Sequence, residues 1–582
     1  MSAYQKILKE YWGYDSFRPL QEDIIASVCD GKDTLGLMPT GGGKSLTFQV
    51  PSLSMDGICI VITPLIALMK DQVDALRQRR IKATMVHSGM SLQEIRIALD
   101  NCIFGDYKFL YVSPERLSSE LFLTKLAAMN VCLIAVDESH CISQWGYDFR
   151  PAYLHIADLR ELLPDVPVLA LTATATPEVI DDIQDKLNFR EKNVFSKSFE
   201  RKNIAYVVRE TGDKLFEIIH ILNNVQGTAI VYVRSRKRTK EIAVELQKHG
   251  ISADYFHAGL TTDEKMRKQN EWKSGQCRVI VCTNAFGMGI DKPDVRVVIH
   301  FELPNSLEEY FQEAGRAGRD EKKSYAVALY SPRDAAQLKK RIKDEFPDKD
   351  FIKDVYEKLA YFYEIGIGMG AETGHNFHIE EFCAVYHYNM THVHSALKIL
   401  HLASYIEYIE ETEKQSKLIF VQTREDLYHL RGMSDDADQL LQVLLRSYTG
   451  LFSDYVYINE NLLAQRTGLS PQTVYENLKM LSYQGIIHYV PAKKVPTIYY
   501  VQNREDLKYL HLPTPIYEDR KKRLEERINR VIEYGSSKNI CRSRLLLNYF
   551  GEKQAPACGH CDVCLAEKHR QKVAQRRFAA DK

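Results

Sequence analysis

The sequence predicts an α/β protein with two parallel-sheet lobes, followed by helical repeats and a small cysteine-rich module. Three observations support this prediction. Short apolar runs alternate with helical patterns up to about residue 345, where the buried runs stop. A short motif then occurs twice, and four of the 12 cysteines gather near the C-terminus. Because a chain of 582 residues is too long for one core, we expect several domains.

The composition is that of a soluble globular protein, with 45% hydrophobic and 26% charged residues. No apolar run approaches the roughly 20 residues that a membrane span needs. The first residues also lack the apolar core of a signal peptide. We therefore expect a cytoplasmic protein without membrane contact. The 77 basic and 77 acidic residues cancel, so any surface that binds nucleic acid would be a local basic patch.

Apolar runs of strand length mark the first 345 residues. Short buried strands separated by helices form parallel sheets, and two such sheets are expected here. The polar stretch Ser198–Asn203 is the expected junction between lobes 1–197 and 198–345. The runs are Thr34–Met38, Ile58–Ile62, Phe109–Val112, Leu133–Val136 and Val168–Leu171, then Ala229–Val233, Val279–Cys282 and Val297–His300.

An internal repeat follows the second lobe. Val421–Leu427 recurs with one change as Val501–Leu507, and this predicts repeat units over 346–432 and 433–512. The helical and strand-like patterns upstream of each copy predict winged-helix-like units. The expected core of the first unit is Ile379, Leu397, Leu400 and Ile406.

The second repeat has the pattern of a winged helix. A glycine turn separates two helical segments within Leu462–Tyr475, which is typical of a helix-turn-helix. Ile486–Val490 and Thr497–Val501 are predicted to form a hairpin whose basic tip carries Lys493 and Lys494. These lysines are candidate contacts to DNA phosphates, and a solvated tip is the alternative.

The C-terminal region combines an amphipathic helix, which starts near Tyr517, with a cysteine cluster inside 513–567. Four thiolates with two C-x-x-C steps suit a structural Zn²⁺ ion. An iron–sulfur cluster is the alternative, and His560 is a candidate substitute ligand. The basic tail 568–582 is expected to be solvated or disordered. The expected zinc ligands are Cys541, Cys558, Cys561 and Cys564.

A glycine-rich run between an apolar strand and a helical pattern predicts a phosphate site. Its glycines let backbone N–H groups turn toward phosphates. Lys44 would reach the β- and γ-phosphates of ATP, and Ser45 would ligate Mg²⁺. Met38 stands where such loops usually begin with glycine; a glycine-rich turn without a ligand is the alternative. The expected loop is Met38, Pro39, Thr40, Gly41, Gly42, Gly43, Lys44 and Ser45.

Charged residues elsewhere complete the predicted phosphoryl-transfer site. Asp137 and Glu138 follow an apolar run. Asp137 would hold Mg²⁺, and Glu138 would orient or deprotonate the attacking water. The second lobe supplies a run that begins at Gln312 and places Arg316 and Arg319 at helical spacing. Because these arginines come from a second lobe, hydrolysis would depend on lobe closure.

These residues, in this order, resemble helicase superfamily two, and specifically the RecQ family of DNA helicases. The resemblance covers roughly residues 10–335 and the cysteine region. One stretch resembles the family's adenine-recognition motif. It implies that Tyr14 stacks on the base, that Gln21 reads the adenine edge and that Arg18 contacts the nucleotide.

Other stretches resemble the family's coupling and DNA-facing motifs. Leu171–Ala175 resembles the motif that links the ATP state to the grip on the strand, through Thr172 and Thr174. A family-specific run around Asp291 implies a nucleotide contact. An aromatic-rich loop resembles the family's sensor of single-stranded DNA, with core packing of its rings as the alternative. Its DNA-binding or coupling residues are Ser143, Gln144, Trp145, Tyr147, Phe149 and Arg150.

The resemblance implies two RecA-like lobes and an ATP-dependent DNA helicase of the isomerase class that moves 3′→5′. The implied cofactors are ATP, Mg²⁺ and Zn²⁺. The resemblance also implies a role in recombination and repair, near the nucleoid. The protein would act as a monomer that binds single-stranded, duplex or forked DNA, and its partners would be single-strand-binding or other repair proteins. Three features depart from the family pattern: Tyr147 replaces a histidine, Glu321 replaces a glycine, and the winged helix precedes the zinc element.

Two other functions stay open at this point. An RNA helicase of a related branch would share the ATP site, and the aromatic loop and zinc cluster argue against it. A non-enzymatic DNA-binding regulator would use the winged helices and zinc alone. The phosphate, metal and arginine elements argue against that second alternative.

Overall fold

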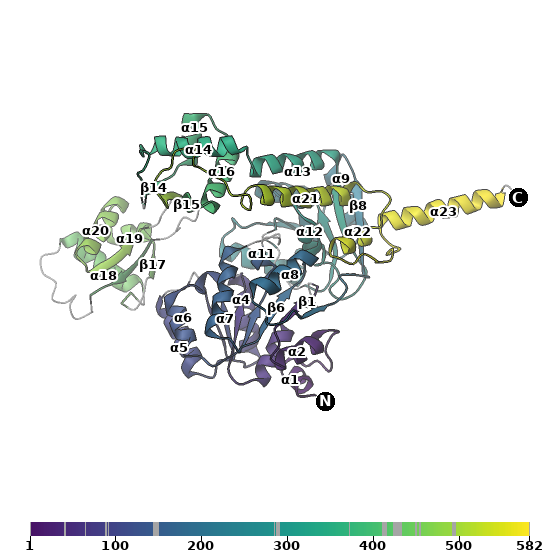
Figure 1. The fold of residues 1–582 in the computed structure, drawn as a ribbon, viewed down its shortest axis with the longest axis horizontal. Helices are drawn as coiled ribbons and strands as arrows, with labels where there is room; N and C mark the ends of the chain where they lie inside the picture. The colour runs from purple at the N-terminus through teal and green to yellow at the C-terminus, as the bar shows by residue number, and fades with distance from the viewer. Residues whose placement is uncertain are drawn as a thin grey trace. The chain divides into compact units, whose positions relative to one another are not determined.

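The computed structural model divides into two compact units. The first comprises Met1–Ser88, Ala98–Leu338 and Glu525–Lys582, and the second comprises Gly89–Ile97 and Lys339–Leu524. Figure 1 shows the chain as a ribbon and labels many of its elements. None of the helices in the described part of the chain is long and apolar enough to cross a membrane. The described residues are 2–39, 42–64, 66–87, 90, 92–143, 150–284, 286, 292–371, 373–409, 416–422, 434–448, 451–452, 456–491 and 496–580.

A seven-stranded parallel sheet forms the first lobe, in the order β3-β4-β2-β5-β6-β1-β7. All five runs expected in this lobe are strands of the sheet. The strands at its two edges, β3 and β7, were not among them. The strands are β1 (Thr34–Leu37), β2 (Ile58–Ile62), β3 (Ala83–Val86), β4 (Phe109–Val112), β5 (Val131–Val136), β6 (Val168–Thr172) and β7 (Val194–Ser196).

A six-stranded parallel sheet forms the second lobe, in the order β10-β11-β9-β12-β13-β8. The three runs expected here are its adjacent strands β11, β9 and β12. The junction Ser198–Asn203 leads directly into the edge strand β8. The strands are β8 (Ile204–Glu210), β9 (Thr228–Tyr232), β10 (Ala253–Phe256), β11 (Val279–Cys282), β12 (Val295–His300) and β13 (Ser324–Tyr330).

Helices connect the parallel strands, as crossover connections require. Several begin at side-chain caps; Thr261 and Glu264 form a reciprocal capping box, and Ser306 accepts a hydrogen bond from the Glu309 N–H at 3.1 Å. The helices are α1 (Ala3–Trp12), α2 (Gln21–Cys29), α3 (Leu46–Ser54), α4 (Ile66–Gln78), α5 (Leu92–Phe104), α6 (Glu120–Leu126), α7 (Ile156–Leu162), α8 (Pro177–Lys186), α9 (Lys214–Asn224), α10 (Arg236–Lys248), α11 (Thr262–Ser274), α12 (Leu307–Ala314) and α13 (Pro332–Glu345).

The neighbouring strands β5, β6 and β1 position the predicted ATP site. Because parallel strands end at the same edge of a sheet, the residues that follow these three strands meet there. The phosphate loop follows β1, Asp137 follows β5, and Thr172 ends β6. Three segments that are far apart in the sequence are therefore adjacent at one edge.

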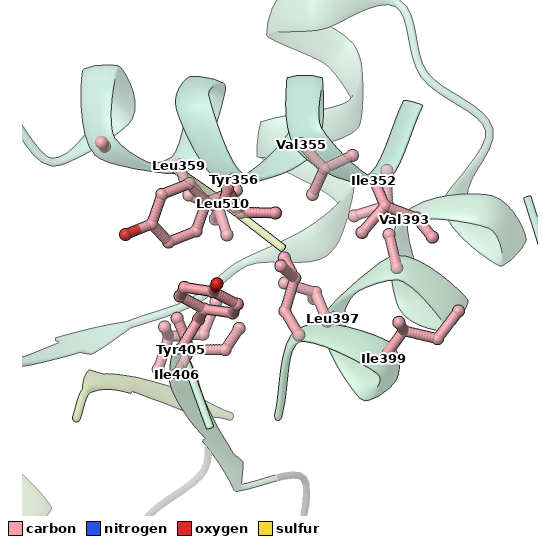
Figure 2. Packing of buried hydrophobic residues seen from close by; sticks show 14 of the residues in the cluster. Ile352, Val355, Tyr356, Leu359, Val393, Leu397, Ile399, Tyr405, Ile406 and Leu510 are labelled. Carbon is pink, nitrogen blue, oxygen red and sulfur yellow. The ribbon is translucent and has the colours of Figure 1, made fainter. Parts of the chain in front are cut away.

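The second unit contains a first winged-helix-like domain whose core joins distant segments. Figure 2 shows Tyr356 and Leu359 of one helix facing Tyr405 and Ile406. Three of the four expected core residues are buried, and Ile379 is partly buried against this core. The elements are α14 (Lys349–Phe362), α15 (Ile379–Tyr386), α16 (Met390–Leu402), β14 (Gly374–Asn376), β15 (Ile406–Ile409) and β19 (Thr497–Tyr500).

A second domain lies between β15 and β19 in the sequence and has its own core. The predicted helix-turn-helix is confirmed: α19 ends at Gly468, whose φ is +72°, and Ser470 caps α20 by accepting from the Thr473 N–H at 3.0 Å. The elements are α18 (Asp435–Ser447), α19 (Glu460–Thr467), α20 (Pro471–Tyr483), β16 (Ser416–Phe420), β17 (Val456–Ile458) and β18 (Ile487–Val490).

The predicted hairpin of the second repeat is wrong. Strand β18 pairs with β16, whereas β19 pairs with β15 and β14 in another sheet. The physical reason is the packing of the side chains. Ile487 is buried in the core of the second domain, and Ile498 and Tyr500 are buried in the core of the first. The expected boundary at 432–433 lies outside the described residues.

The C-terminal module returns to the first unit. The amphipathic helix expected from Tyr517 is α21 (Glu518–Ser536), followed by α22 (Arg542–Tyr549) and α23 (Asp562–Ala580). Of the two alternatives given for the basic tail, solvated or disordered, the helix that continues up to Ala580 removes disorder for residues 568–580. The tail is solvated as expected, since the side chains of residues 565–575 are exposed. This helix carries five basic residues after Cys564: Lys568, Arg570, Lys572, Arg576 and Arg577.

Glu321 gives a stability prediction. Its φ is 62°, in the left-handed region that costs a residue with a Cβ atom about 1–2 kcal/mol. Glu321→Gly is therefore expected to raise the free energy of unfolding in urea by about 1 kcal/mol. Glu241→Gly in the middle of α10 is the control and should lower it by about 1 kcal/mol. A loss of stability in Glu321→Gly would contradict the argument from backbone strain.

Candidate nucleotide and zinc sites

The phosphate loop connects β1 to the N-terminus of α3. The Met38 N–H donates to the Thr172 carbonyl at 3.0 Å, and the Gly42 N–H donates to the Pro39 carbonyl at 2.9 Å. Gly43 has a φ of +79°, and a Cβ atom there would lie 2.3 Å from Nε2 of Gln21. Glycine is therefore required at this position. Ser45 precedes α3 without using its hydroxyl as a cap, so the hydroxyl fits a metal ligand.

Lys44 lies next to the acidic pair. Its Nζ is 3.8 Å from Oε1 of Glu138, and both side chains are largely buried. Among the described residues, Nζ has no hydrogen-bond partner. A buried ammonium without a hydrogen bond is costly, and phosphate oxygens would supply the missing acceptors. The residues present therefore fit an anionic nucleotide.

Asp137 and Glu138 have opposite electrostatic environments. Burial and the charge of Glu138 raise the pKa of Asp137 to about 6. Burial also raises the pKa of Glu138, but the charges of Lys44, His140 and Arg316 outweigh this and hold it below its usual value. Glu138 is thus the more acidic group of the pair. Its φ of 49° is a left-handed conformation, of the kind that clusters at functional sites.

Arg316 brings a second-lobe charge to this pair. It follows α12 and is buried, and its charge contributes to the low pKa of Glu138. Its Nε has no hydrogen-bond partner among the described residues. Gln312 is buried one turn earlier, and Arg319 is half-buried beyond it. Lys44 therefore lies next to Glu138, and the charge of Arg316 acts on the same carboxylate.

His140 lies between the acidic pair and β6, with Nδ1 3.5 Å from Oε2 of Glu138. Nδ1 of His140 lies 2.9 Å from Oγ1 of Thr172, which also accepts from the Thr174 N–H at 3.3 Å. Both threonines are buried, so in this arrangement they fit coupling rather than direct contact with DNA. His140 was not among the predicted site residues. Its position directly after the Asp137-Glu138-Ser139 run could have identified it as a site residue.

Several other predicted residues lie in the described part of the chain. Ser143 is buried and donates to Oδ2 of Asp182 at 2.6 Å, and Nη1 of Arg150 lies 3.4 Å from the Pro64 carbonyl. Tyr14 is 56% exposed, which leaves its ring open for stacking. The predicted residues outside the described part of the chain are Thr40, Gly41, Gln144, Trp145, Tyr147, Phe149, Asp291, Lys493 and Lys494.

Gln21 contacts the phosphate loop rather than open space. It is 1% exposed, and its Nε2 donates to the carbonyls of Gly42 at 3.3 Å and Gly43 at 3.0 Å. Its Oε1 accepts from the Arg18 N–H at 2.8 Å. In this structure the amide therefore fixes the loop backbone. Recognition of an adenine edge by Gln21 stays a proposal.

Four cysteines form the predicted metal site. Their sulfur atoms all lie within 4.8 Å of one another. Sγ of Cys541 is 3.5 Å from Sγ of Cys558 and 3.9 Å from Sγ of Cys561, close to the roughly 3.8 Å edge of a tetrahedron with zinc–sulfur bonds of about 2.3 Å. His560 is no substitute ligand here, because its ring nitrogens face the carbonyls of Cys558 and Ile204 at 2.7 and 3.1 Å. The cluster therefore fits zinc with four thiolates.

A buried pair in the second lobe lies close to Arg316. Nε2 of His300 is 2.9 Å from Oε2 of Glu313. Burial lowers the pKa of His300 to about 3. Burial raises the pKa of Glu313 to about 8, despite the opposing charges of Arg316 and Arg234. Burial thus favours the neutral form of each group, the imidazole of His300 and the carboxylic acid of Glu313.

Glu313 gives a pH prediction. A carboxyl group whose pKa rises from 4.5 to about 8 on folding stabilises the fold fully below pH 4.5, and this stabilisation is lost as the pH rises toward 8. The Glu313→Gln variant should not show this pH-dependent loss of stability. Between about pH 5 and 8, the unfolding free energy of the parent should fall relative to the variant by up to about 1.4 kcal/mol per pH unit. Parallel stability profiles would contradict an acid form of Glu313.

Four family models match the chain. They are the DEAD/DEAH box helicase model over 18–183, the helicase conserved C-terminal domain over 211–321, the RecQ helicase winged-helix domain of Bacteroidota over 418–491, and the RecQ zinc-binding model over 502–565. The order of the last two agrees with the sequence, in which the winged helix precedes the zinc element.

Relatives match about three fifths of the chain. The chain is 43% identical over 364 residues to the probable ATP-dependent DNA helicase RecS of Bacillus subtilis, covering 62% of this chain and 73% of RecS. It is 42% identical to the ATP-dependent DNA helicase RecQ of Haemophilus influenzae, covering 62% and 58%. A protein of Acanthamoeba polyphaga mimivirus, named as an ATP-dependent RNA helicase, is 41% identical and covers 57% and 61%. The chain thus spans less than two thirds of the length of the last two relatives. It belongs to the RecQ family of helicases.

Proposed function

We propose that this protein is an ATP-dependent DNA helicase of the isomerase class, which moves 3′→5′ along single-stranded DNA and unwinds duplexes. The observation that supports this most is the position of Glu138, whose Oε1 lies 3.8 Å from Nζ of Lys44 and whose pKa the charge of Arg316 helps to lower. The first two come from one lobe and the third from the other. Such a site can hydrolyse ATP and can also make hydrolysis depend on lobe closure.

The chemistry follows from the residues. Bound ATP with Mg²⁺ would supply the phosphoryl group and its leaving group. Lys44 would bind phosphate oxygens, and Ser45 and Asp137 would hold the metal. The low pKa of Glu138 keeps it ionised, so that it can orient or accept a proton from water. Arg316 and Arg319 would neutralise the charge that develops on the transferred group.

The DNA part of the proposal depends on the aromatic loop and on the His140–Thr172 hydrogen bond. Trp145 and Phe149 would stack on bases, at about 1–3 kcal/mol per base. Thr172 would relay the state of Glu138 to the strand, because His140 lies 3.5 Å from Oε2 of Glu138 and 2.9 Å from Oγ1 of Thr172. We further propose that the protein acts in recombination and repair, as a monomer in the cytoplasm beside the nucleoid.

The test is strand displacement on defined duplexes with 3′ or 5′ single-stranded tails. The parent should unwind DNA from a 3′ tail with ATP and Mg²⁺. Lys44→Ala should lose ATP turnover and unwinding together, while Lys32→Ala, which changes an exposed lysine of the same lobe, should retain both. ATP turnover that survives in Lys44→Ala would overturn the assignment of the motor site.

An RNA helicase is the second candidate, because one relative carries that name. All-DNA and all-RNA duplexes of the same sequence distinguish the two functions. Faster unwinding of RNA, or ATP turnover stimulated by RNA alone, would replace the DNA assignment. ATP turnover without any unwinding would indicate a translocase that does not separate strands.

A further inference from the structure

The segment Gly315–Gly318, which carries Arg316, is held through its backbone. Arg201 of the interlobe junction donates from Nη1 to the Gly315 carbonyl at 3.1 Å, and from Nη2 to the carbonyls of Ala317 at 3.1 Å and Gly318 at 3.2 Å. These carbonyls lie at the C-terminal end of α12, where a cation is favourable to the helix dipole. One guanidinium thus contacts the backbone on both sides of Arg316.

A second junction residue tightens the same segment. Nδ2 of Asn203 donates to the carbonyls of Gly318 at 2.7 Å and Lys322 at 3.1 Å. Gly318 has a φ of +55°, and a Cβ atom there would lie 2.5 Å from Nδ2 of Asn203 and 2.6 Å from Oγ of Ser324. The backbone is therefore packed too closely to shift without breaking these contacts.

The C-terminal module (α21 to α23), or zinc module, contacts the other end of the junction. Glu552 accepts from the Phe199 N–H at 2.6 Å and from Oγ of Ser198 at 2.8 Å. The ring of Phe550 lies 4.9 Å from that of Phe199 and 5.0 Å from that of Phe311 in α12. These contacts connect the residues just before Arg201 to the C-terminal module.

The module also contacts α12 directly, and helices α22 and α12 lie side by side (Figure 1). Oη of Tyr549 donates to Oε1 of the buried Glu308 at 2.8 Å, and Oη of Tyr534 donates to Oη of Tyr310 at 3.2 Å. The helix that precedes Arg316 is therefore held by the module, and the segment that contains Arg316 is held by the junction.

We propose that Arg201 is a positioning residue for Arg316, and that the zinc module braces it through Glu552. This inference rests on the proposed ATPase function of the site. Arg201 touches no reacting group; it fixes the backbone from which the Arg316 side chain extends. The N–H groups of the segment bond within the second lobe, those of Arg316 and Gly318 to the carbonyls of Glu313 and Val295, and Arg201 supplies partners for the segment's own carbonyls. A displacement of about 1 Å at a catalytic group can cost about 10²-fold in rate.

The first experiment compares Arg201→Gln and Arg201→Lys in the full chain. Arg201→Gln should lower kcat for DNA-stimulated ATP hydrolysis by about 10- to 100-fold, with the KM for ATP and the binding of a fluorescent ATP analogue within about threefold of the parent. Arg201→Lys keeps the charge and one donor group but loses the planar fork, so it should recover part of kcat.

Arg278→Gln is the matched control. Arg278 is in the same lobe and also clamps carbonyls, those of Leu222, Val225 and Gly227 at 2.5, 2.8 and 3.0 Å, but it does not touch 315–318. It should destabilise the lobe without selective loss of kcat. A parental kcat in Arg201→Gln, or an equal loss in Arg278→Gln, would overturn the positioning role. A parent without ATPase activity would instead overturn the proposed function.

The second experiment tests the brace with Glu552→Ala alone and together with Arg201→Gln. If Glu552 acts through Arg201, the double variant should lose little more kcat than Arg201→Gln alone. Lys553→Ala, an exposed neighbour, is the control and should match the parent. If the losses of kcat in the two single variants multiply in the double variant, the zinc module does not act through this junction. A parental kcat in Glu552→Ala would lead to the same conclusion.

Discussion

Replacing Arg316 by alanine is expected to lower DNA-stimulated ATP turnover by about 10³- to 10⁵-fold. The guanidinium is buried in the second lobe, and its charge reaches Glu138 in the first. In phosphoryl transfer a positive charge from a second lobe stabilises the transition state and not the bound substrate. The loss should therefore appear in kcat, measured by steady-state phosphate release, while the affinity for ATP changes little.

Two further variants sharpen this prediction. Arg333→Ala changes an exposed arginine of the same lobe and should leave kcat at the parental value. Arg316→Lys keeps a charge but not the planar donor fork, so it should recover only a small part of the lost activity. A kcat within tenfold of the parent in Arg316→Ala would mean that another cation serves the γ-phosphate.

The second large effect is expected from the zinc ligands. Structural zinc contributes about 10–16 kcal/mol to the folding of zinc-finger peptides, so removal of one thiolate should unfold the module. Cys561→Ser should lose the one equivalent of zinc that the parent is expected to bind, as measured by atomic absorption. Hydrogen exchange should then accelerate in residues 541–564. We also expect a lower thermal midpoint for the second lobe, whose edge strand β8 donates the Val208 N–H to Asp562 at 3.3 Å.

Cys132→Ser provides the control for the chemistry of the substitution. Cys132 is a half-buried thiol in the first lobe, remote in sequence from the metal cluster. This variant should keep its zinc and show parental exchange in residues 541–564. If Cys561→Ser kept both the metal and the slow exchange of the module, the four-thiolate assignment would be contradicted. An ultraviolet–visible spectrum with iron–sulfur absorption would contradict zinc itself.

Most central strands of both lobes could be predicted from the sequence because strands buried on both faces are continuously apolar, although the inner strand β13 was not among the predicted ones. Edge strands carry weaker patterns: β7 is Val-Phe-Ser, and β10 mixes Asp254 with aromatic residues. The pairing of β19 could not be predicted. An apolar pattern shows that Ile498 and Tyr500 are buried but does not identify which core receives them.

The residues of the candidate ATP site could be named from the sequence because they lie in local motifs, after strands β1 and β5 and after helix α12. Lys44, Glu138 and Arg316 each lie in a run of recognisable residue types. The contacts that hold the arginine segment were not predictable in this way. Glu552 and Phe199 are 353 positions apart in the chain, and a lone glutamate after a helix carries no local signal of its partner. The same is true of Gln21, whose amide contacts the loop backbone.

The insertion between β15 and β19 has a consequence for how the chain folds. Strand β15 ends at Ile409, and its partner β19 begins at Thr497, so the first winged-helix-like domain cannot complete its sheet until the inserted domain has left the ribosome. A folded insert would shorten the effective loop that must close between the two strands, which reduces the entropy cost of pairing them. Once folded, the inserted domain would then bring the two strands of the surrounding domain closer together during synthesis.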